Sequence, residues 1–316
     1  MADKLLRVEN LNKSFKTGKT KTDALTNCSF YVERGSVCGL LGMNGAGKTT
    51  AIKCISNLLI PESGNVFYNS IDITKKTKTA AENISVLLDG GRNLFWFLSV
   101  EENIKYFSLI KNAKPVDQNK KGKIYEYLEL NSILKRPIHQ LSFGMKQRAN
   151  IAAALMNSSE LFIFDEPTTG LDIKFQNDLK NLIKILNTEF GVTILLSSHD
   201  MEFVKETCSD CILIHEGRTL RQEKTENFLT LFNTVIYEII FRKTIDDSQK
   251  EQLKNSFSIV EMNDEVCKIA WNNSNDLNEL FLKLDGFGIK IKTLSSENTL
   301  RSSVINLIGG VINSSA

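Results

Sequence analysis

The chain has 316 residues, a length that suggests about two domains of ordinary size. Hydrophobic residues make up 42% and charged residues 24%, which excludes extended disorder, and the net charge of +2 argues against a strongly basic nucleic-acid binder. No apolar run is long enough to span a membrane, and the first ten residues lack the apolar core of a signal peptide. Six cysteines do not make a disulfide scaffold, so we expect a reducing, cytoplasmic compartment.

Short apolar runs alternate with helical patterns over roughly the first 200 residues. Alternation and apolar runs predict strands at 5–9, 29–33, 37–41, 66–73, 84–88, 161–164 and 192–197. Helical spacing is found at 49–59 and over most of 99–156, where Ser99 and Glu102 form a predicted capping box. Strands separated by helices predict a parallel sheet with crossover connections.

The balance of charges changes near residue 225. The part from Glu226 onward carries a net charge of −3 and the part before it +5. Beyond this point the patterns predict strands at 234–242, 257–261, 266–271 and 288–294, with helices at 246–253, 275–284 and 297–308. The first six of these elements follow the βαββαβ order of a small α+β domain. We therefore expect an N-terminal domain at 1–224 and a C-terminal accessory domain at 225–316.

A phosphate-binding pattern lies between a predicted strand and a predicted helix. Residues 42–49 (GMNGAGKT) fit G-x-x-x-x-G-K-[ST], in which glycines let several backbone N–H groups point at one phosphate. The Lys48 ammonium would bind the β and γ phosphates, and the Thr49 hydroxyl can bind Mg²⁺. The residues predicted to bind nucleotide here are Gly42, Asn44, Gly45, Ala46, Gly47, Lys48, Thr49 and Thr50.

Two acids follow the apolar run at 161–164. A buried strand that ends in an acid is how a P-loop enzyme places its second Mg²⁺ contact, which predicts that role for Asp165. The adjacent Glu166 would reach the γ-phosphate side and polarise an attacking water as a general base.

Further segments carry the likeness to a known family. Residues 141–148 (LSFGMKQR) resemble the ABC signature, 167–172 (PTTGLD) the D-loop and 197–200 (SSHD) the switch-histidine segment. Phe15 lies where this family places an aromatic residue that stacks on adenine. In order and spacing, the motifs over about residues 4–224 are similar to the ATP-binding cassette of ABC transporters.

This resemblance implies an α/β fold: a P-loop NTPase cassette with a mostly parallel core sheet, an antiparallel β part and a helical subdomain at about 90–156. It implies that ATP and Mg²⁺ bind and that two cassettes pair head to tail. The signature segment of one cassette would then cover the ATP on the other, through Ser142, Gly144 and Asp172. His199 would contact the γ-phosphate and complete a catalytic set with Lys48 and Glu166.

Two positions depart from the family pattern. Asp89 stands at the end of a predicted strand where the family usually has Gln, and a carboxylate accepts hydrogen bonds but donates none. We expect a modified Mg²⁺ or water contact there, which makes the expected metal set Thr49, Asp165 and Asp89. The signature has Phe143 and Met145 where Gly and Gln are usual.

The aromatic segment 93–98 (NLFWFL) lies in the region that, in this family, receives a cytoplasmic helix from the membrane subunit; a local core cluster is the alternative. Cys208 and Cys211 form a lone CxxC with no second pair, which favours buried structural cysteines over a metal site. His139 and His215 are expected to have no functional role.

The resemblance implies a transport ATPase, and the C-terminal appendix resembles the exporter branch of the family. The expected partners are a separate transmembrane permease and a second copy of the chain or a homologous cassette, with no nucleic acid. The expected location is the cytoplasmic face of the cell membrane, as a peripheral protein. The alternatives are a soluble ABC-type ATPase acting on ribosomes or nucleic acid, and a regulator that binds ATP without turnover. The single cassette disfavours the first and Glu166 the second.

Overall fold

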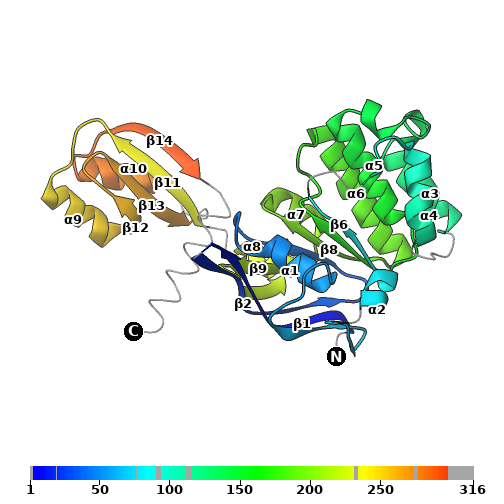
Figure 1. The fold of residues 1–316 in the computed structure, drawn as a ribbon. Coiled ribbons are helices and arrows are strands. Elements are labelled where there is room, and N and C mark those ends of the chain that lie inside the picture. The colour runs from blue at the N-terminus through cyan, green and yellow to red at the C-terminus, as the bar shows by residue number, and fades with distance from the viewer. Residues whose placement is uncertain are drawn as a thin grey trace. The chain divides into compact units, whose positions relative to one another are not determined.

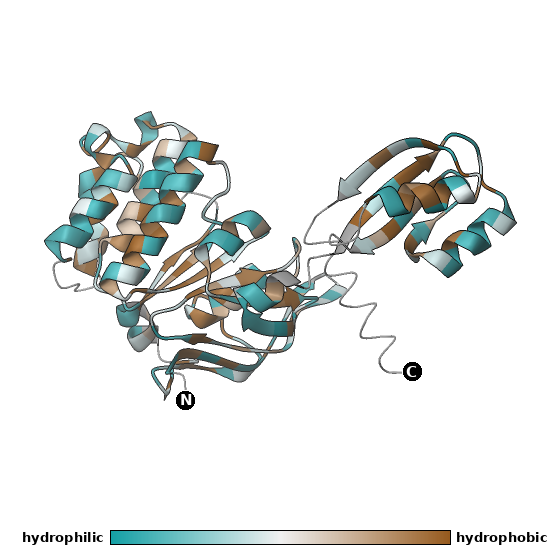
Figure 2. Cartoon of the chain, turned by 180° about the vertical axis from the view of Figure 1, so that it is seen from behind, coloured by the Kyte–Doolittle hydropathy of each residue, from teal (hydrophilic) through white to brown (hydrophobic). Residues whose placement is uncertain are grey.

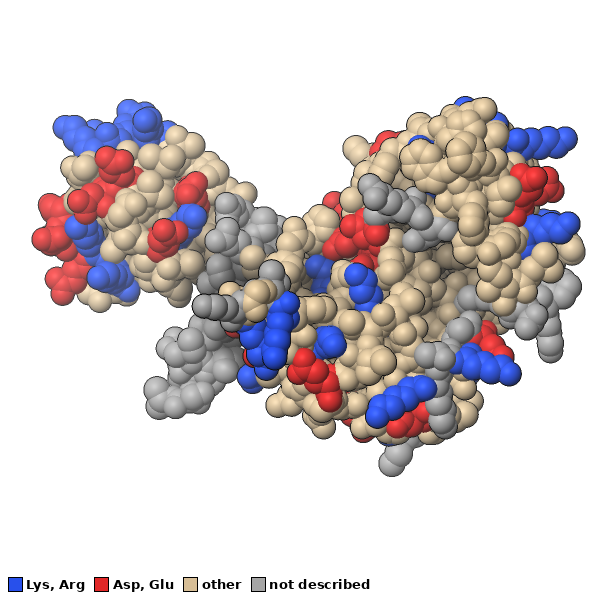
Figure 3. Space-filling model, in the orientation of Figure 1, with Lys and Arg blue, Asp and Glu red and all other residues tan. Residues whose placement is uncertain are grey.

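The computed structural model describes residues 3–18, 20–75, 77–89, 94–110, 116–230, 234–272 and 277–297. Its contacts divide the chain into two units, Met1–Thr225 and Glu226–Ala316 (Figure 1). No helix within the described residues is long and apolar enough to cross a bilayer. On the face drawn in Figure 3, basic and acidic side chains are interspersed over each unit, in keeping with the net charge of +2.

A six-stranded sheet forms the centre of the first unit, in the order β10-β9-β3-β8-β7-β6. Its strands are β3 (Val37–Leu41), β6 (Ile84–Leu87), β7 (Leu161–Asp165), β8 (Thr193–Ser198), β9 (Asp210–His215) and β10 (Arg218–Lys224). All pairings are parallel except that of β10 with β9, which confirms the mostly parallel core sheet. Every residue of β3, β7 and β8 is buried, as expected of strands covered on both faces. The strands at the centre of this unit are mostly brown in Figure 2, the colour of hydrophobic residues.

A second sheet is antiparallel, in the order β2-β1-β4-β5. It consists of β1 (Lys4–Thr17), β2 (Thr20–Glu33), β4 (Ser63–Tyr68) and β5 (Ile71–Asp72). The predictions for β1 and β2 were too short, because the first four residues of β2 are exposed and lack the alternation that marks a half-buried strand. The prediction of one strand at 66–73 was wrong. Asn69 and Ser70, with φ of 47° and 64°, turn the chain back in a two-residue hairpin.

Helices cover the sheets. The α-helices of the first unit are α1 (Lys48–Ile55), α2 (Thr77–Asn83), α3 (Val100–Ile110), α4 (Gln118–Tyr127), α5 (Phe143–Leu155), α6 (Ile173–Phe190) and α7 (Met201–Thr207). Helix α8 (Thr225–Thr230) begins with the last residue of this unit and continues into the second. Two 3₁₀ turns, η1 (Leu130–Ser132) and η2 (Ile138–Gln140), lie between α4 and α5, so the segment 99–156 is largely helical as predicted. The capping box is confirmed: Glu102 accepts from the Ser99 backbone at 2.7 Å, and the Ser99 hydroxyl accepts from the Glu102 N–H at 3.2 Å. Helix α1 is shorter than predicted, because Asn57 adopts a left-handed conformation with φ of 57°.

The second unit has the predicted βαββαβ order. Its elements are β11 (Thr234–Phe241), α9 (Asp247–Ser256), β12 (Ser258–Met262), β13 (Val266–Asn272), α10 (Leu277–Gly286) and β14 (Ile291–Glu297). The sheet is antiparallel in the order β12-β13-β11-β14, so β13 lies between the two strands that α9 connects. Residues such as Ile239, Leu253 and Leu280 form a core of this unit's own. Glu297 ends β14, and the rest of the helix predicted at 297–308 lies outside the described residues.

Candidate functional site

The phosphate-binding loop connects β3 to α1, as the sequence predicts. The predicted residues Gly42, Asn44, Gly45, Ala46 and Gly47 lie on this connection, and Lys48, Thr49 and Thr50 begin α1. Gly47 has a φ of 105°, and a Cβ there would lie 2.6 Å from the Ala24 carbonyl oxygen. A Cβ on Gly45 would have nothing within 4 Å, so this glycine lies at the open side of the loop. The backbone can therefore approach a phosphate closely at the N-terminus of α1.

Lys48 is buried and turned toward its own loop. Its ammonium donates to the Gly42 carbonyl oxygen at 2.7 Å and to that of Met43 at 3.4 Å. A carboxylate oxygen of Glu166 lies 3.4 Å from the same ammonium. The Lys48 ammonium, which is predicted to bind the β and γ phosphates, thus lies at the loop and next to the predicted general base Glu166.

Thr49 and Asp165 meet across the sequence. The Thr49 hydroxyl donates to Oδ2 of Asp165 at 2.8 Å, and Asp165 is fully buried. A hydroxyl and a carboxylate are hard oxygen ligands, which suit Mg²⁺ when phosphate oxygens and waters complete the octahedron. The pair therefore fits the metal that the sequence implies. The described residues contain no cluster of three or more His, Cys, Asp or Glu that could hold a metal by themselves.

Ser197 joins the two acids and was given no role by the sequence analysis. Its hydroxyl donates to Oδ1 of Asp165 at 2.6 Å and accepts from the Glu166 backbone N–H at 2.9 Å. The parallel register of β7 and β8 sets Asp165 directly opposite Ser197. A hydroxyl at the carboxyl end of a buried strand was the available signal, since the ends of neighbouring parallel strands lie at one sheet edge.

Glu166 links Lys48 to His199. One carboxylate oxygen lies 3.4 Å from the Lys48 ammonium, and the other lies 2.8 Å from Nδ1 of His199. The Glu166 side chain is 13% exposed and that of His199 60% exposed. Glu166 also has a φ of 47°, a conformation that is uncommon for a residue other than glycine. The structure thus brings the three predicted catalytic residues together, with the carboxylate held at the centre.

Ser142, Gly144 and Asp172 form a separate cluster. Ser142 caps α5 by accepting from the Met145 N–H at 3.3 Å, and Asp172 caps α6 by accepting from the Phe175 N–H at 2.8 Å. Both residues and Gly144 line a cavity of about 280 Å³. Within the described residues, no hydrogen bond or ion pair joins this cluster to the phosphate-binding loop. The residues predicted to bind nucleotide therefore lie in two separate clusters of one chain.

The remaining predicted contacts lie apart from the acids. Phe15 is on β1, 43% exposed, with the Lys13 ammonium 5.9 Å from the ring centroid. Asp89 lies two residues after β6 and is exposed. Among the described residues, no hydrogen bond or ion pair links Asp89 to Thr49 or Asp165. Of the expected metal set, the structure joins Thr49 and Asp165, and a metal contact by Asp89 stays a prediction.

Cys208 and Cys211 are buried free thiols, as the sequence analysis expected. Burial raises the pKa of Cys208 well above its usual range and that of Cys211 to about 11. Thiols with such pKa values stay protonated at neutral pH and are poor nucleophiles and metal ligands.

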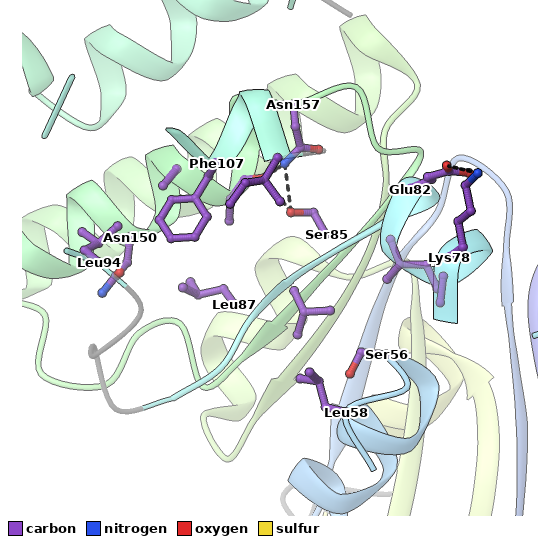
Figure 4. A pocket seen from close by; sticks show the side chains of 16 residues that line it. Ser56, Leu58, Lys78, Glu82, Ser85, Leu87, Leu94, Phe107, Asn150 and Asn157 are labelled. Carbon is purple, nitrogen blue, oxygen red and sulfur yellow. Dashed lines mark hydrogen bonds and ion pairs between the residues drawn. The ribbon is translucent and has the colours of Figure 1, made fainter. Parts of the chain in front are cut away.

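A larger cavity, of about 540 Å³, lies at α2, β6, α3 and α5. Figure 4 shows the amide of Asn157 bonded to the Ser85 hydroxyl, at 3.0 Å, while Asn150 lies beside Leu94 at one end. Asn150 is 2% exposed, and within the described part of the chain neither its amide nitrogen nor its amide oxygen has a hydrogen-bond partner. The cavity thus combines a mostly apolar lining with one unsatisfied buried amide, which costs free energy unless a partner supplies the hydrogen bonds.

The predicted aromatic segment borders this cavity. Leu94 lines it, whereas Phe95, Trp96 and Phe97 are 46%, 51% and 87% exposed. Residue 93 lies outside the described residues. These exposures favour a contact surface over the alternative of a local core cluster. We call Phe95, Trp96 and Phe97 the aromatic patch.

Comparison with known proteins agrees with these observations. A family model described as "ABC transporter" matches residues 25–169. NatA of Bacillus subtilis (strain 168), named an ABC transporter ATP-binding protein, is 33% identical over 71% of this chain and 91% of NatA. MetN 1 of Oceanobacillus iheyensis, named a methionine import ATP-binding protein, is 29% identical over 79% of this chain and 75% of MetN 1. The solved structure of the ATP-binding cassette MJ0796, described as a dimer in a post-hydrolysis state with ADP and Pi, matches with a TM-score of 0.64 and 26% identity, over 70% of this chain and 98% of that one.

Proposed function

This chain belongs to the ABC transporter family of ATP-binding cassettes and hydrolyses ATP, and on this premise we propose that it drives transport through a separate membrane permease. One observation carries the proposal: Lys48, Thr49 and the two acids gather at the phosphate-binding loop, whereas Ser142, Gly144 and Asp172 line a separate cavity. We take these clusters to be the two halves of a nucleotide site. Two copies paired head to tail would complete two sites. The dimeric MJ0796 cassette supports this arrangement.

We assign roles from the geometry of the first half-site. ATP phosphates bind at the loop, where Lys48 and the N-terminus of α1 supply positive charge. Thr49 and Asp165 would hold Mg²⁺, which neutralises charge on the phosphates when bound. Glu166 orients the attacking water and accepts its proton as the water oxygen bonds to the γ-phosphorus and the bond to ADP breaks. His199 holds the Glu166 carboxylate on the side opposite Lys48.

Glu166→Gln tests the assignment of the general base. The variant keeps the shape of the side chain but loses its basicity, so ATP hydrolysis should fall by about 10²-fold or more while ATP still binds. Glu216→Gln is a matched control, because Glu216 has nearly the same backbone φ, 46°, but an 84% exposed side chain. Steady-state phosphate release and equilibrium nucleotide binding give the two readouts. Unchanged turnover in Glu166→Gln would refute the role.

We place the permease contact at the aromatic patch and the larger cavity. A permease helix whose apolar side chains enter the cavity would also offer a hydrogen-bonding group to the unpartnered amide of Asn150. The chain would then lie peripherally on the cytoplasmic face of the membrane. Phe97→Asp should abolish co-purification with the permease and leave the ATPase activity of the isolated chain unchanged. Co-purification with ribosomes or nucleic acid instead would favour the alternative of a soluble ABC-type ATPase.

The resemblance to the exporter branch also implied a direction of transport, namely export. NatA carries no direction in its name and MetN 1 is named an import protein, so these relatives do not favour export. Our proposal is therefore transport, with export as one outcome of a direct measurement. Inside-out vesicles that hold the chain and its permease should accumulate the cargo on adding ATP if the system is an exporter, and should release preloaded cargo if it is an importer.

A further inference from the structure

Phe143, the residue that departs from the family pattern, packs on Gly170. A Cβ placed on Gly170 would lie 2.2 Å from Cε1 and 2.9 Å from Cδ1 of the Phe143 ring. The ring edge therefore occupies the space where any other residue would carry its side chain. Gly170 also has a φ of 72°, which disfavours other residues by itself. The rest of the Phe143 side chain is open to solvent, since the residue is 57% exposed.

The loop that contains Gly170 begins at the candidate general base. The Thr169 N–H donates to the Glu166 carbonyl oxygen at 3.2 Å, and the loop continues to Asp172, the cap of α6. Helix α5 contacts this loop at two points. Gln147 donates to the Pro167 carbonyl oxygen at 3.4 Å near its start, and the Phe143 ring covers Gly170 near its end.

We infer that Phe143 is a positioning residue that holds the signature segment and the 167–172 loop together as one surface for a second copy of this chain. The inference rests on the proposed cassette dimer. Ser142 and Gly144 flank Phe143 and would meet the ATP on the second copy, whereas Glu166 serves the ATP on its own chain. The Phe143–Gly170 contact therefore connects the signature segment, which would face the second copy, to the 167–172 loop, which follows Glu166 in the same chain.

Exposure of Phe143 does not carry this inference, because single exposed apolar side chains are common. The contact carries it. Phe143 is the first residue of α5, and its ring packs on Gly170 of the loop. Gly170 has no side chain with which it could make a contact of its own. A glycine at position 143, as in the family pattern, would leave Gly170 without this neighbour.

Dimer formation measures the effect. In a Glu166→Gln background, ATP with Mg²⁺ should yield a dimer whose dissociation constant is obtained by sedimentation. Adding Phe143→Ala should raise that constant by about tenfold, the size expected for loss of one coupled contact. Affinity of the monomer for a fluorescent ATP analogue should not change, since the ring lies outside the phosphate-binding loop. The conservative variant Phe143→Tyr should dimerise as tightly as the chain with Phe143. Phe281→Ala, at a 43% exposed aromatic residue of α10, should have no effect on dimerisation.

A double-mutant cycle isolates the ring contact. Gly170→Ala adds the same backbone strain in both backgrounds, but its methyl group clashes with the ring only where Phe143 is present. Its effect on the dimer dissociation constant should be several-fold larger with Phe143 than with Phe143→Ala. If thermal unfolding shows that Phe143→Ala is not folded, Phe143→Leu takes its place in the cycle.

The outcomes separate this inference from the proposed function. If the Glu166→Gln chain forms no ATP-dependent dimer, the proposed dimer fails and the inference fails with it. If it dimerises and Phe143→Ala dimerises equally well, or if Gly170→Ala has the same effect in both backgrounds, only the role of Phe143 is overturned.

Discussion

At the scale of single residues, the acids after β7 are held by a hydroxyl from the neighbouring strand. Ser197 is fully buried, and its one oxygen serves both Asp165 and the Glu166 backbone. Without it, Glu166 would lose a hydrogen bond at a residue whose backbone is already in an uncommon conformation. The position of the candidate base thus depends on a residue that takes no part in the proposed chemistry.

Ser197→Ala tests this dependence. The substitution leaves the half-buried Glu166 N–H and a buried carboxylate oxygen of Asp165 short of a partner, so the free energy of unfolding should fall by about 1–3 kcal/mol. ATP hydrolysis should also fall and require more Mg²⁺, because Asp165 is no longer held from both sides. Chemical denaturation and Mg²⁺ titrations of the activity give the readouts. Ser198→Ala, at the next fully buried serine, should leave the Mg²⁺ requirement unchanged.

At the scale of elements, Glu129 ties α5 to α6. It accepts a hydrogen bond from Lys174 of α6 at 2.6 Å and another from Arg148 of α5. The Lys174 and Arg148 hydrogen bonds, together with the Arg148 charge, lower the pKa of Glu129 from its ordinary 4.5 to about 2. Ser142 caps α5 and Asp172 caps α6, so this network links the two helices that carry the second half-site.

The lowered pKa of Glu129 predicts how stability depends on pH. A carboxyl whose pKa is lower in the folded state binds fewer protons there, so its contribution is complete above pH 4.5 and is lost as the pH falls toward 2. Glu129→Gln lacks this contribution at every pH. Urea unfolding should therefore show the two proteins differing most above pH 4.5 and converging near pH 2. Because Glu129 is 43% exposed, the difference should shrink in high salt. Parallel pH curves would contradict the assignment.

At the scale of the whole molecule, the described residues form two units with separate cores. The first unit holds both halves of the candidate site. Thr225 belongs with it, since its N–H donates to the Ser209 carbonyl oxygen at 3.0 Å and its hydroxyl lies 3.3 Å from the Cys211 sulfur. Every residue assigned to either half lies in the first unit.

This organisation predicts that a chain cut after Thr225 folds and hydrolyses ATP. Each unit buries its own apolar side chains, so removing the second should expose little of the first core. Circular dichroism and phosphate release compare the cut chain with the full one. The matched cut after Glu223 removes the Thr225 bonds and should be less stable. Loss of folding in the chain cut after Thr225 would show that the first unit depends on the second.

The sequence by itself determined the features that depend on local order. The loop at 42–49 needs its glycines, lysine and threonine at fixed spacing, and Asp165 and Glu166 follow an uninterrupted apolar strand. The sequence alone therefore predicted both the loop and the pair of acids. The βαββαβ order was also predictable from the sequence, because alternation and helical spacing are properties of neighbouring residues. The hairpin at Asn69 and Ser70 was not, since two left-handed residues interrupt an otherwise continuous pattern.

Only the tertiary structure decided which distant residues meet. The register of β7 against β8 places Ser197 beside Asp165, and the packing of α5 on the 167–172 loop places Phe143 on Gly170. The spacing of neighbouring residues predicts neither contact, because each joins segments that are distant in the sequence and that sheet order or helix packing brings together. The same reason explains the two half-sites. The motifs follow one another along the chain, but the fold places them in two clusters. Among the described residues, no hydrogen bond or ion pair joins Ser142, Gly144 or Asp172 to the phosphate-binding loop.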